Sequence, residues 1–201
     1  MNATDLLRKQ HRGISSLFKQ LEKTKEEEKK RDIFEELAAT LVAHDAIERE
    51  LFYPACEKEL GMTTELGEAL VEHGLVEFSL YQADQARNDD DFEFKCTVLE
   101  EVVDHHVEEE EKEFLPKAEK ALGKRRLVEL GAEMEARFDE ARSEDFRAPL
   151  HKNLKQVLAG AIKPATNGRS AKKHATNGRS AKTSASKKHS KRAAASRASA
   201  R

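Results

Sequence analysis

The sequence repeats part of itself at an offset of 62 residues. His11 and His44 lie 33 residues apart, and His73 and His106 have the same spacing. The second histidine of each pair begins a related phrase, with a glutamate, a phenylalanine and a proline at matching positions: His44, Glu48, Phe52 and Pro54, then His106, Glu110, Phe114 and Pro116. This register predicts a helical hairpin used twice, each copy bringing nitrogen and carboxylate ligands to one buried metal site.

Apolar residues recur at three- and four-residue steps through the first 145 positions, without the alternation of strands. Five helices are therefore expected near 4–23, 31–59, 64–87, 92–121 and 124–142. Long helices with short connections pack antiparallel. The predicted fold class is all-α: an up-down-up-down four-helix bundle with a fifth helix that covers its end or flank.

Prolines and glycines mark the expected helix ends. Pro54 should bend or interrupt the second helix, because proline lacks a backbone donor and clashes with the preceding turn, and Pro116 mirrors it in the fourth. Gly61 and Gly123 suit the C-terminal ends of these helices. An N-cap for the third helix is expected at residues 63–64, where Thr63 or Thr64 offers the hydroxyl.

The net charge of −2 conceals two oppositely charged parts. No acidic residue follows Asp145, and 15 of the 36 Lys and Arg residues lie between Arg147 and Arg201. Positions 1–145 hold 21 basic and 38 acidic residues, a net charge of −17. We therefore divide the chain into a metal-binding bundle, an additional packing helix and a basic Ala/Lys/Ser-rich tail: 1–122, 123–145 and 146–201.

The tail has little apolar surface to bury and is expected to be largely disordered. Residues 150–162 could still form a short amphipathic helix, with five apolar side chains on one side: Leu150, Leu154, Val157, Leu158 and Ala161.

The sequence also bears on compartment. No run of 18 apolar residues occurs, which excludes a membrane span, and the N-terminus lacks the basic-then-apolar order of a secretory signal. Cys56 and Cys96 have no metal spacing and are expected to be reduced core thiols. These features predict a cytoplasmic protein, which could be a monomer or a dimer.

A residue and its fourth neighbour share one helix face. Three helices therefore offer an imidazole and a carboxylate side by side: His44 with Glu48, His73 with Glu77, and His106 with Glu110. All four histidines, His11 included, lie within apolar stripes and should point into the core. A buried unpaired carboxylate takes up a proton, because desolvating its charge costs several kcal/mol or more. Several carboxylates beside several imidazoles make sense around a multivalent cation.

Other interpretations were weighed against this one. A single inward histidine is usually a hydrogen-bonded core residue, and Glu four positions from His is common on solvated helices. One histidine per helix in duplicated register favours metal binding. Glu77 is the weakest candidate, because Ser15 takes its place beside His11. His105 competes with His106, but the repeat favours His106 and leaves His105 as a supporting or surface residue.

Imidazole and carboxylate without thiolate suit iron, manganese or zinc. Ferritin-like di-iron proteins use Glu-x-x-His, and that position holds Leu41, Leu70 and Val103 here, which argues against a ferritin-type site. The motifs instead resemble those of the hemerythrin-like, or HHE cation-binding, domain over roughly residues 1–120: His11, His44-x3-Glu48 with Pro54, His73-x3-Glu77, and His106-x3-Glu110 with Pro116.

This resemblance implies a bundle around a non-haem di-iron centre with two iron ions. Glu48 and Glu110 would be bridging carboxylates, and the four histidines terminal ligands. Oxygen-carrying hemerythrins have a second histidine on the third helix where this chain has Glu77. Glu77 in place of this histidine implies redox chemistry or sensing rather than reversible oxygen carriage. Manganese and zinc are the alternative metals.

We accordingly expect a protein that binds, senses or reacts with a small oxidant: dioxygen, peroxide or nitric oxide. Whether it is an enzyme stays open, because turnover would reside in the metals and no Ser-His-Asp or Cys-His nucleophile arrangement occurs. Two alternatives are a nucleoid-associated DNA-binding protein with the bundle as scaffold, and an iron storage or buffering protein.

The basic tail needs its own explanation. It resembles the Lys/Ala/Ser-rich tails of linker-histone-like proteins, and residues 163–201 could contact DNA or RNA without sequence preference. No aromatic residue follows Phe146, so base stacking is not available, and the tail lacks an apolar membrane anchor. A solvated spacer, or a tail lying against the acidic bundle, are the other interpretations.

Overall fold

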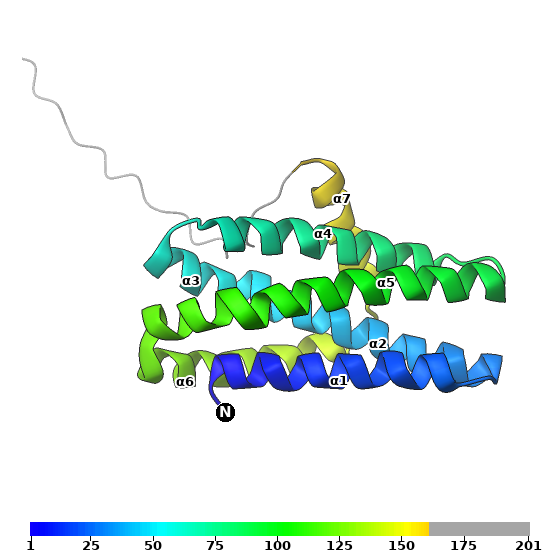
Figure 1. Cartoon of the computed structure of the whole chain (residues 1–201), viewed down its shortest axis with the longest axis horizontal. Helices are drawn as coiled ribbons and strands as arrows, with labels where there is room; N and C mark the ends of the chain where they lie inside the picture. The colour runs from blue at the N-terminus through cyan, green and yellow to red at the C-terminus, as the bar shows by residue number, and fades with distance from the viewer. Residues whose placement is uncertain (161–201) are drawn as a thin grey trace, which may run out of the picture. The chain divides into compact units, whose positions relative to one another are not determined.

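The computed structural model describes residues 1–160, and this part of the chain is helical apart from short connections, with no strand. In chain order the elements are α1 (Ala3–Lys23), α2 (Glu27–Ile47), the π-helical turn η1 (Glu48–Phe52), α3 (Tyr53–Leu60), α4 (Thr64–Asp84), α5 (Asp89–Glu109), the π-helical turn η2 (Glu110–Phe114), α6 (Leu115–Arg142) and α7 (Arg147–Leu158). Consecutive long helices run antiparallel, as Figure 1 shows for α1, α2, α4 and α5. The predicted all-α, up-down-up-down bundle with a further helix after Gly123 is confirmed.

Side-chain caps account for several helix starts. Asn2 accepts the Asp5 N–H at 2.9 Å, Thr63 accepts that of Leu66 at 3.2 Å, and Asn88 accepts that of Asp91 at 2.8 Å. Each cap satisfies a donor that the first helical turn leaves unpaired. Of the two threonines considered for the third helix, Thr63 is the cap.

Three helix boundaries differ from the expected ones by three or four residues. α2 begins at Glu27, not near 31, because part of the charged run after α1 forms the first turn of α2. Its leading glutamates suit the positive end of the helix dipole. α5 begins at Asp89 rather than 92, because Asn88 caps it from within the expected turn, and α4 ends at Asp84 rather than 87.

The two prolines do not interrupt their helices where expected. Each stands in the first turn of the following helix, α3 or α6, where its missing N–H is not needed. The irregularity lies just before the proline, where the Tyr53 N–H bonds to the Glu48 carbonyl and the Leu115 N–H to the Glu110 carbonyl. Hydrogen bonds to the carbonyl five residues earlier, instead of four, widen the helix into a π turn, which is a feature frequent at functional sites. Both turns begin at a candidate ligand.

The fifth helical segment is the part of α6 after Gly123, whose φ of 70° breaks the helix. It packs lengthwise on α1 and α2, so it covers a flank of the bundle (Figure 1). Gly131 is required at the crossing with the chain start, because a Cβ there would lie 2.4 Å from the Met1 carbonyl oxygen.

α7 packs on α4, and Phe146, Leu150 and Leu154 are buried. The sequence-based division gave residues from 146 onward to the tail, whereas the described part extends the packed region to Leu158, itself exposed. The predictions for 163–201, and the place of Ala161, lie outside the described residues.

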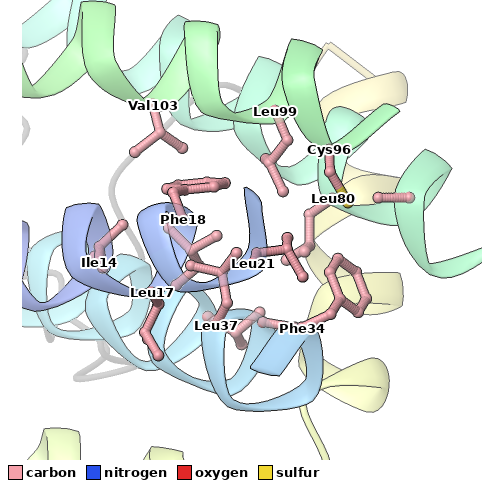
Figure 2. Close-up of a cluster of buried hydrophobic side chains, with 14 of the residues drawn as sticks. Ile14, Leu17, Phe18, Leu21, Phe34, Leu37, Leu80, Cys96, Leu99 and Val103 are labelled. Atoms are coloured by element: carbon pink, nitrogen blue, oxygen red, sulfur yellow. The ribbon is translucent and has the colours of Figure 1, made fainter. Parts of the chain in front are cut away.

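Two apolar clusters fill the bundle, one on each side of a layer of histidines. The first brings together side chains from α1, α2, α4 and α5; Figure 2 shows Phe18, Phe34, Leu80 and Leu99 of this cluster facing one another. The second lies at the other end and includes Leu7, Phe52, Tyr53, Leu70 and Phe114. Each cluster removes apolar surface from water at about 25 cal/mol per Å², which is the main source of stability. The layer between them is held by rigid packing on both sides.

Cys56 and Cys96 are free and buried, as expected. None of the helices in residues 1–160 combines the length and apolar character needed to cross a bilayer.

Candidate metal centre

Six side chains from four helical segments meet between the two apolar clusters. They are His11 (α1), His44 and Glu48 (α2 and η1), His73 (α4), and His106 and Glu110 (α5 and η2). None is more than 5 % exposed. The structure thus brings together six of the seven predicted ligands.

The histidines form two pairs joined by carboxylates. The Nε2 atoms of His11 and His44 lie 3.2 Å apart, as do those of His73 and His106. Glu48 stands between the pairs, with Oε2 at 3.3 Å from His44 Nε2 and 3.2 Å from His73 Nε2. Glu110 Oε2 lies 3.3 Å from His11 Nε2. Two groups of three convergent ligand atoms result: His11, His44 and Glu48, and Glu48, His73 and His106.

The other ring nitrogen of each histidine faces an oxygen of a neighbouring helix. The distances from Nδ1 are 2.8 Å for His11 to Glu111, 2.8 Å for His44 to Gln10, 2.6 Å for His73 to Asp45 and 2.9 Å for His106 to Glu72. Because these partners are acceptors, each Nδ1 carries the proton and each Nε2 presents a lone pair to the centre. Such outer hydrogen bonds orient and strengthen metal-ligating imidazoles.

These contacts form a closed ring around the bundle. Gln10 of α1 supports His44 of α2, Asp45 of α2 supports His73 of α4, and Glu72 of α4 supports His106 of α5. Glu111 of η2 then supports His11 of α1. Every supporting residue therefore lies beside a candidate ligand of its own segment and serves the histidine of the next.

The spacing of the ligand atoms fits a metal ion. Two lone pairs facing each other at 3.2 Å repel unless a proton or cation lies between them. Nitrogen ligands about 2.1 Å from one ion, at roughly tetrahedral or octahedral angles, are about 3.0–3.4 Å apart. The Nε2 separations fall in that range.

The buried carboxylates also indicate a metal ion. Neither oxygen of Glu48, nor Oε2 of Glu110, has a hydrogen-bond partner among the described residues. Burial, and then the nearby Glu110 charge, raises the pKa of Glu48 well above its usual range. Burial likewise lowers the pKa of His44 well below its usual value, with the neighbouring His11 charge adding to the shift. Burial lowers the pKa of His11, but the carboxylates of Glu110 and Glu111 outweigh it and raise that pKa above its usual value. Without a cation the centre therefore holds a proton between His11 and Glu110, which a multivalent cation would replace.

Glu77, the seventh candidate, lies apart from both ligand groups. Its Oε2 is 3.3 Å from Nη2 of buried Arg49, whose Nε donates to Asp45 at 2.6 Å. Asp45 also accepts hydrogen bonds from His73 and, at 3.2 Å, from Asn153 of α7. Because all its partners are donors, Asp45 carries the negative charge of this group. Burial and the Asp45 charge raise the pKa of Glu77 to about 8, although Arg49 opposes the shift.

Tyr53 is a further fully buried polar side chain at the centre. Its hydroxyl lies 2.9 Å from His73 Nε2 and donates to Glu110 Oε1 at 3.3 Å. The corresponding residue in the second repeat is Leu115, so the repeat gave no signal for it.

A small cavity of about 30 Å³ adjoins the centre. Its polar wall consists of His44, Asp45, His73, Glu77 and His106. Its apolar residues include Ile14, Leu41, Val76, Leu80, Val103 and Val107. This space is about that of one water molecule. It suits a diatomic or similarly small ligand.

Sequence reasoning also missed the four supporting residues, Gln10, Asp45, Glu72 and Glu111. Their signal is weak: a polar residue adjacent to a predicted ligand, on helices rich in charge. His105 is exposed, and its Nε2 lies 3.5 Å from Glu72 and 3.6 Å from Glu109. His106 is thus the inward member of the adjacent pair.

Comparisons with known proteins agree with this geometry. The family model described as the hemerythrin HHE cation binding domain matches residues 2–118. The crystal structure of a hemerythrin HHE cation-binding domain-containing protein from Mycobacterium kansasii is similar, with 27% sequence identity and a TM-score of 0.66 over 77% of this chain and 99% of that one. No curated protein matches significantly. The chain belongs to the hemerythrin HHE cation-binding domain family.

Proposed function

We propose that the bundle holds a non-haem di-iron centre that reacts with a small oxidant. His11, His44, His73 and His106 would be terminal ligands, and Glu48 and Glu110 would be shared by the two ions. The observation that carries the proposal is the orientation of the four imidazoles: every Nδ1 is engaged outward and every Nε2 converges inward in pairs 3.2 Å apart. Glu77 is left out of the ligand set, because it lies outside both groups of convergent ligand atoms.

The donor set is compatible with iron. The convergent atoms are imidazole nitrogens and carboxylate oxygens, and both described thiols lie outside the ligand groups. Such donors suit iron, manganese or zinc, and iron would supply redox chemistry when bound. The fit rests on unpaired buried carboxylates, which need a cation.

The residues around the centre define what can react there. The cavity at His44, His73 and His106 admits a ligand of a few atoms and excludes larger ones. Glu77 faces the same cavity and holds a proton near neutral pH, so a proton donor lies opposite the histidines. An apolar wall with two buried acids, Asp45 and Glu77, supports reaction with dioxygen, peroxide or nitric oxide rather than with an organic substrate.

The decisive measurement is metal analysis of the purified protein, with absorption spectra recorded anaerobically and after dioxygen, peroxide or nitric oxide. We expect about two iron ions per chain and an oxidant-dependent visible band. A protein that binds no iron, or whose spectrum ignores all three oxidants, would contradict the proposal. A stable ferrous oxygen adduct that forms and reverses would indicate oxygen carriage instead.

We further propose that residues 163–201 contact nucleic acid or another polyanion. The support is compositional: no acidic residue follows Asp145, so phosphates meet uncompensated Lys and Arg. Retention of the full chain on DNA should fall steeply with salt, and a chain ending at Gly160 should not be retained. Equal retention of both would exclude the tail as the contact.

A further inference from the structure

A narrow crevice leads from the surface to the centre between α4 and the α5–η2 segment. Besides the candidate ligand Glu110, five glutamates line it: Glu65, Glu68, Glu72, Glu109 and Glu113. Glu68 and Glu113 are exposed at its rim, whereas His106 and Glu110, which also line it, are buried. The crevice encloses about 20 Å³, close to the space of a single small ion or water molecule.

The buried end of the crevice carries an unpartnered ligand atom. Glu110 is 3 % exposed, and its Oε2 has no hydrogen-bond donor in the described part of the chain. His11 Nε2 lies 3.3 Å from this oxygen, and the Nδ1 of His11 faces Glu111. A cation that passes the glutamates would therefore meet a free carboxylate oxygen at the bottom.

A further group of convergent ligand atoms adjoins the crevice through Glu72 and Glu109. Glu72, His105 and Glu109 direct one ligand atom each to a common point, with His105 Nε2 at 3.5 Å from Glu72 and 3.6 Å from Glu109. The two oxygens of Glu72 have different partners, since Oε1 faces His105 and Oε2 accepts from His106 at 2.9 Å. Glu72 thus touches both the outer group and a candidate inner ligand.

We propose that this crevice is the route by which divalent cations reach the buried centre, with Glu72, His105 and Glu109 as an outer docking point. This inference rests on the proposed metal centre. Carboxylates gathered in a cleft with low-dielectric walls focus the field and raise the local concentration of cations. The apolar cavity on the other side of the histidines offers no comparable set of charges: Asp45, already bonded to Arg49, and protonated Glu77 are its acids.

One positive charge stands at the rim, because Lys117 pairs with Glu65. Steering therefore depends mainly on the exposed pair Glu68 and Glu113. The variant Glu68→Gln/Glu113→Gln removes two charges from the rim without touching any of the six convergent side chains. A matched control is Glu28→Gln/Glu135→Gln, which removes two exposed carboxylates that do not line the crevice.

The test is stopped-flow uptake of Co²⁺ by the metal-free full-length protein, followed through the visible absorption that changes when imidazole replaces water. In 10 mM salt the rim variant should take up Co²⁺ about 3–10-fold more slowly than the control, within the range expected of electrostatic steering. The difference should vanish in about 0.5 M salt, where charges are screened within a few ångströms. His105→Asn should also slow uptake, and the final amount of bound Co²⁺ should be the same in all variants.

Equal uptake rates for the rim variant, His105→Asn and the control would overturn the route. That result is distinct from failure of the metal centre itself, in which the unaltered protein would bind no Co²⁺ at equilibrium. Restoring the rim charge with Glu68→Asp/Glu113→Asp should restore fast uptake, whereas slow uptake in this variant would attribute the effect to side-chain shape and count against steering.

Discussion

The His11/His44 pair and the His73/His106 pair have the same Nε2 separation but different surroundings. Around the first pair the supporting oxygens come from the neutral amide Gln10 and the half-exposed Glu111. Around the second they come from buried Asp45 and from Glu72. Tyr53 also lies at the second pair.

Access differs in the same direction. The small cavity touches both histidines of the second pair but only His44 of the first, and the acidic crevice ends at His106 and Glu110. Repetition of a helical hairpin has thus produced equal ligand spacing with unequal charge and access. We infer that small ligands approach from the His73/His106 side, while the His11/His44 side mainly holds an ion.

The largest effect on metal binding should come from Glu48, which contacts both histidine pairs. Glu48→Gln keeps the size of the side chain but removes the charge that lies 3.3 Å from His44 and 3.2 Å from His73. We expect affinity for both metal ions to fall by about 100-fold or more, beyond the 10–100-fold typical of outer partners. Metal titration of the apoprotein measures this. Loss of only one ion would mean that Glu48 serves a single half.

Substitutions of the supporting residues should affect the two histidine pairs unequally. Asp45→Asn weakens the partner of His73 and unpairs Arg49, whereas Gln10→Leu removes a neutral partner of His44. Hydrogen bonds to a charged acceptor are roughly twice as strong as neutral ones. We expect about 10–100-fold weaker binding at one site for Asp45→Asn and a smaller loss for Gln10→Leu. Equal losses would remove the electrostatic difference between the halves.

The sequence was informative about the ligands for a physical reason. Buried imidazoles, one per helix and in a register set by the repeat, must face the same interior. The four histidines and two carboxylates that meet there could therefore be named from the sequence. Glu77 as a ligand stays a prediction: its helix face also meets Arg49, a contact that depends on the order of the helices. The ring of supporting residues likewise depends on which helices are neighbours.

Three further features, the π turns, Tyr53 and helix α7, could be recognised only from the structure. The π turns at Glu48 and Glu110 are choices between hydrogen-bond partners that a proline permits but does not dictate. Tyr53 has Leu115 as its repeat counterpart, so symmetry pointed away from it. The extension of the packed region through α7 rests on Leu150 and Leu154, too few apolar positions to distinguish packing from a free helix.

Unequal access can be tested by filling the cavity. Val103→Leu adds one carbon to a side chain that lines the 30 Å³ space beside His73 and His106. We expect the iron-loaded protein to react with nitric oxide or peroxide several-fold more slowly, with unchanged iron content, at a stability cost of about 1–3 kcal/mol for overpacking. Val128→Leu, at an exposed position, is the control. An unaltered rate would indicate that ligands arrive by another path.

The smallest effect concerns the buried acid on the His73 side. Burial raises the pKa of Glu77 to about 8 in the folded protein, above its ordinary value of 4.5. The folded state therefore holds this proton more tightly, so its stabilising contribution is complete below pH 4.5 and is lost as the pH rises through about 8. Between these limits the melting temperature of the metal-free protein should fall with rising pH. Glu77→Gln should flatten this slope, changing the melting temperature at pH 8 relative to pH 5 by about 5 °C.

Glu135→Gln, at an exposed position, should keep the original slope. An unchanged slope in Glu77→Gln would mean that Arg49 keeps Glu77 ionised, and the proton donor at the cavity would have to be sought elsewhere.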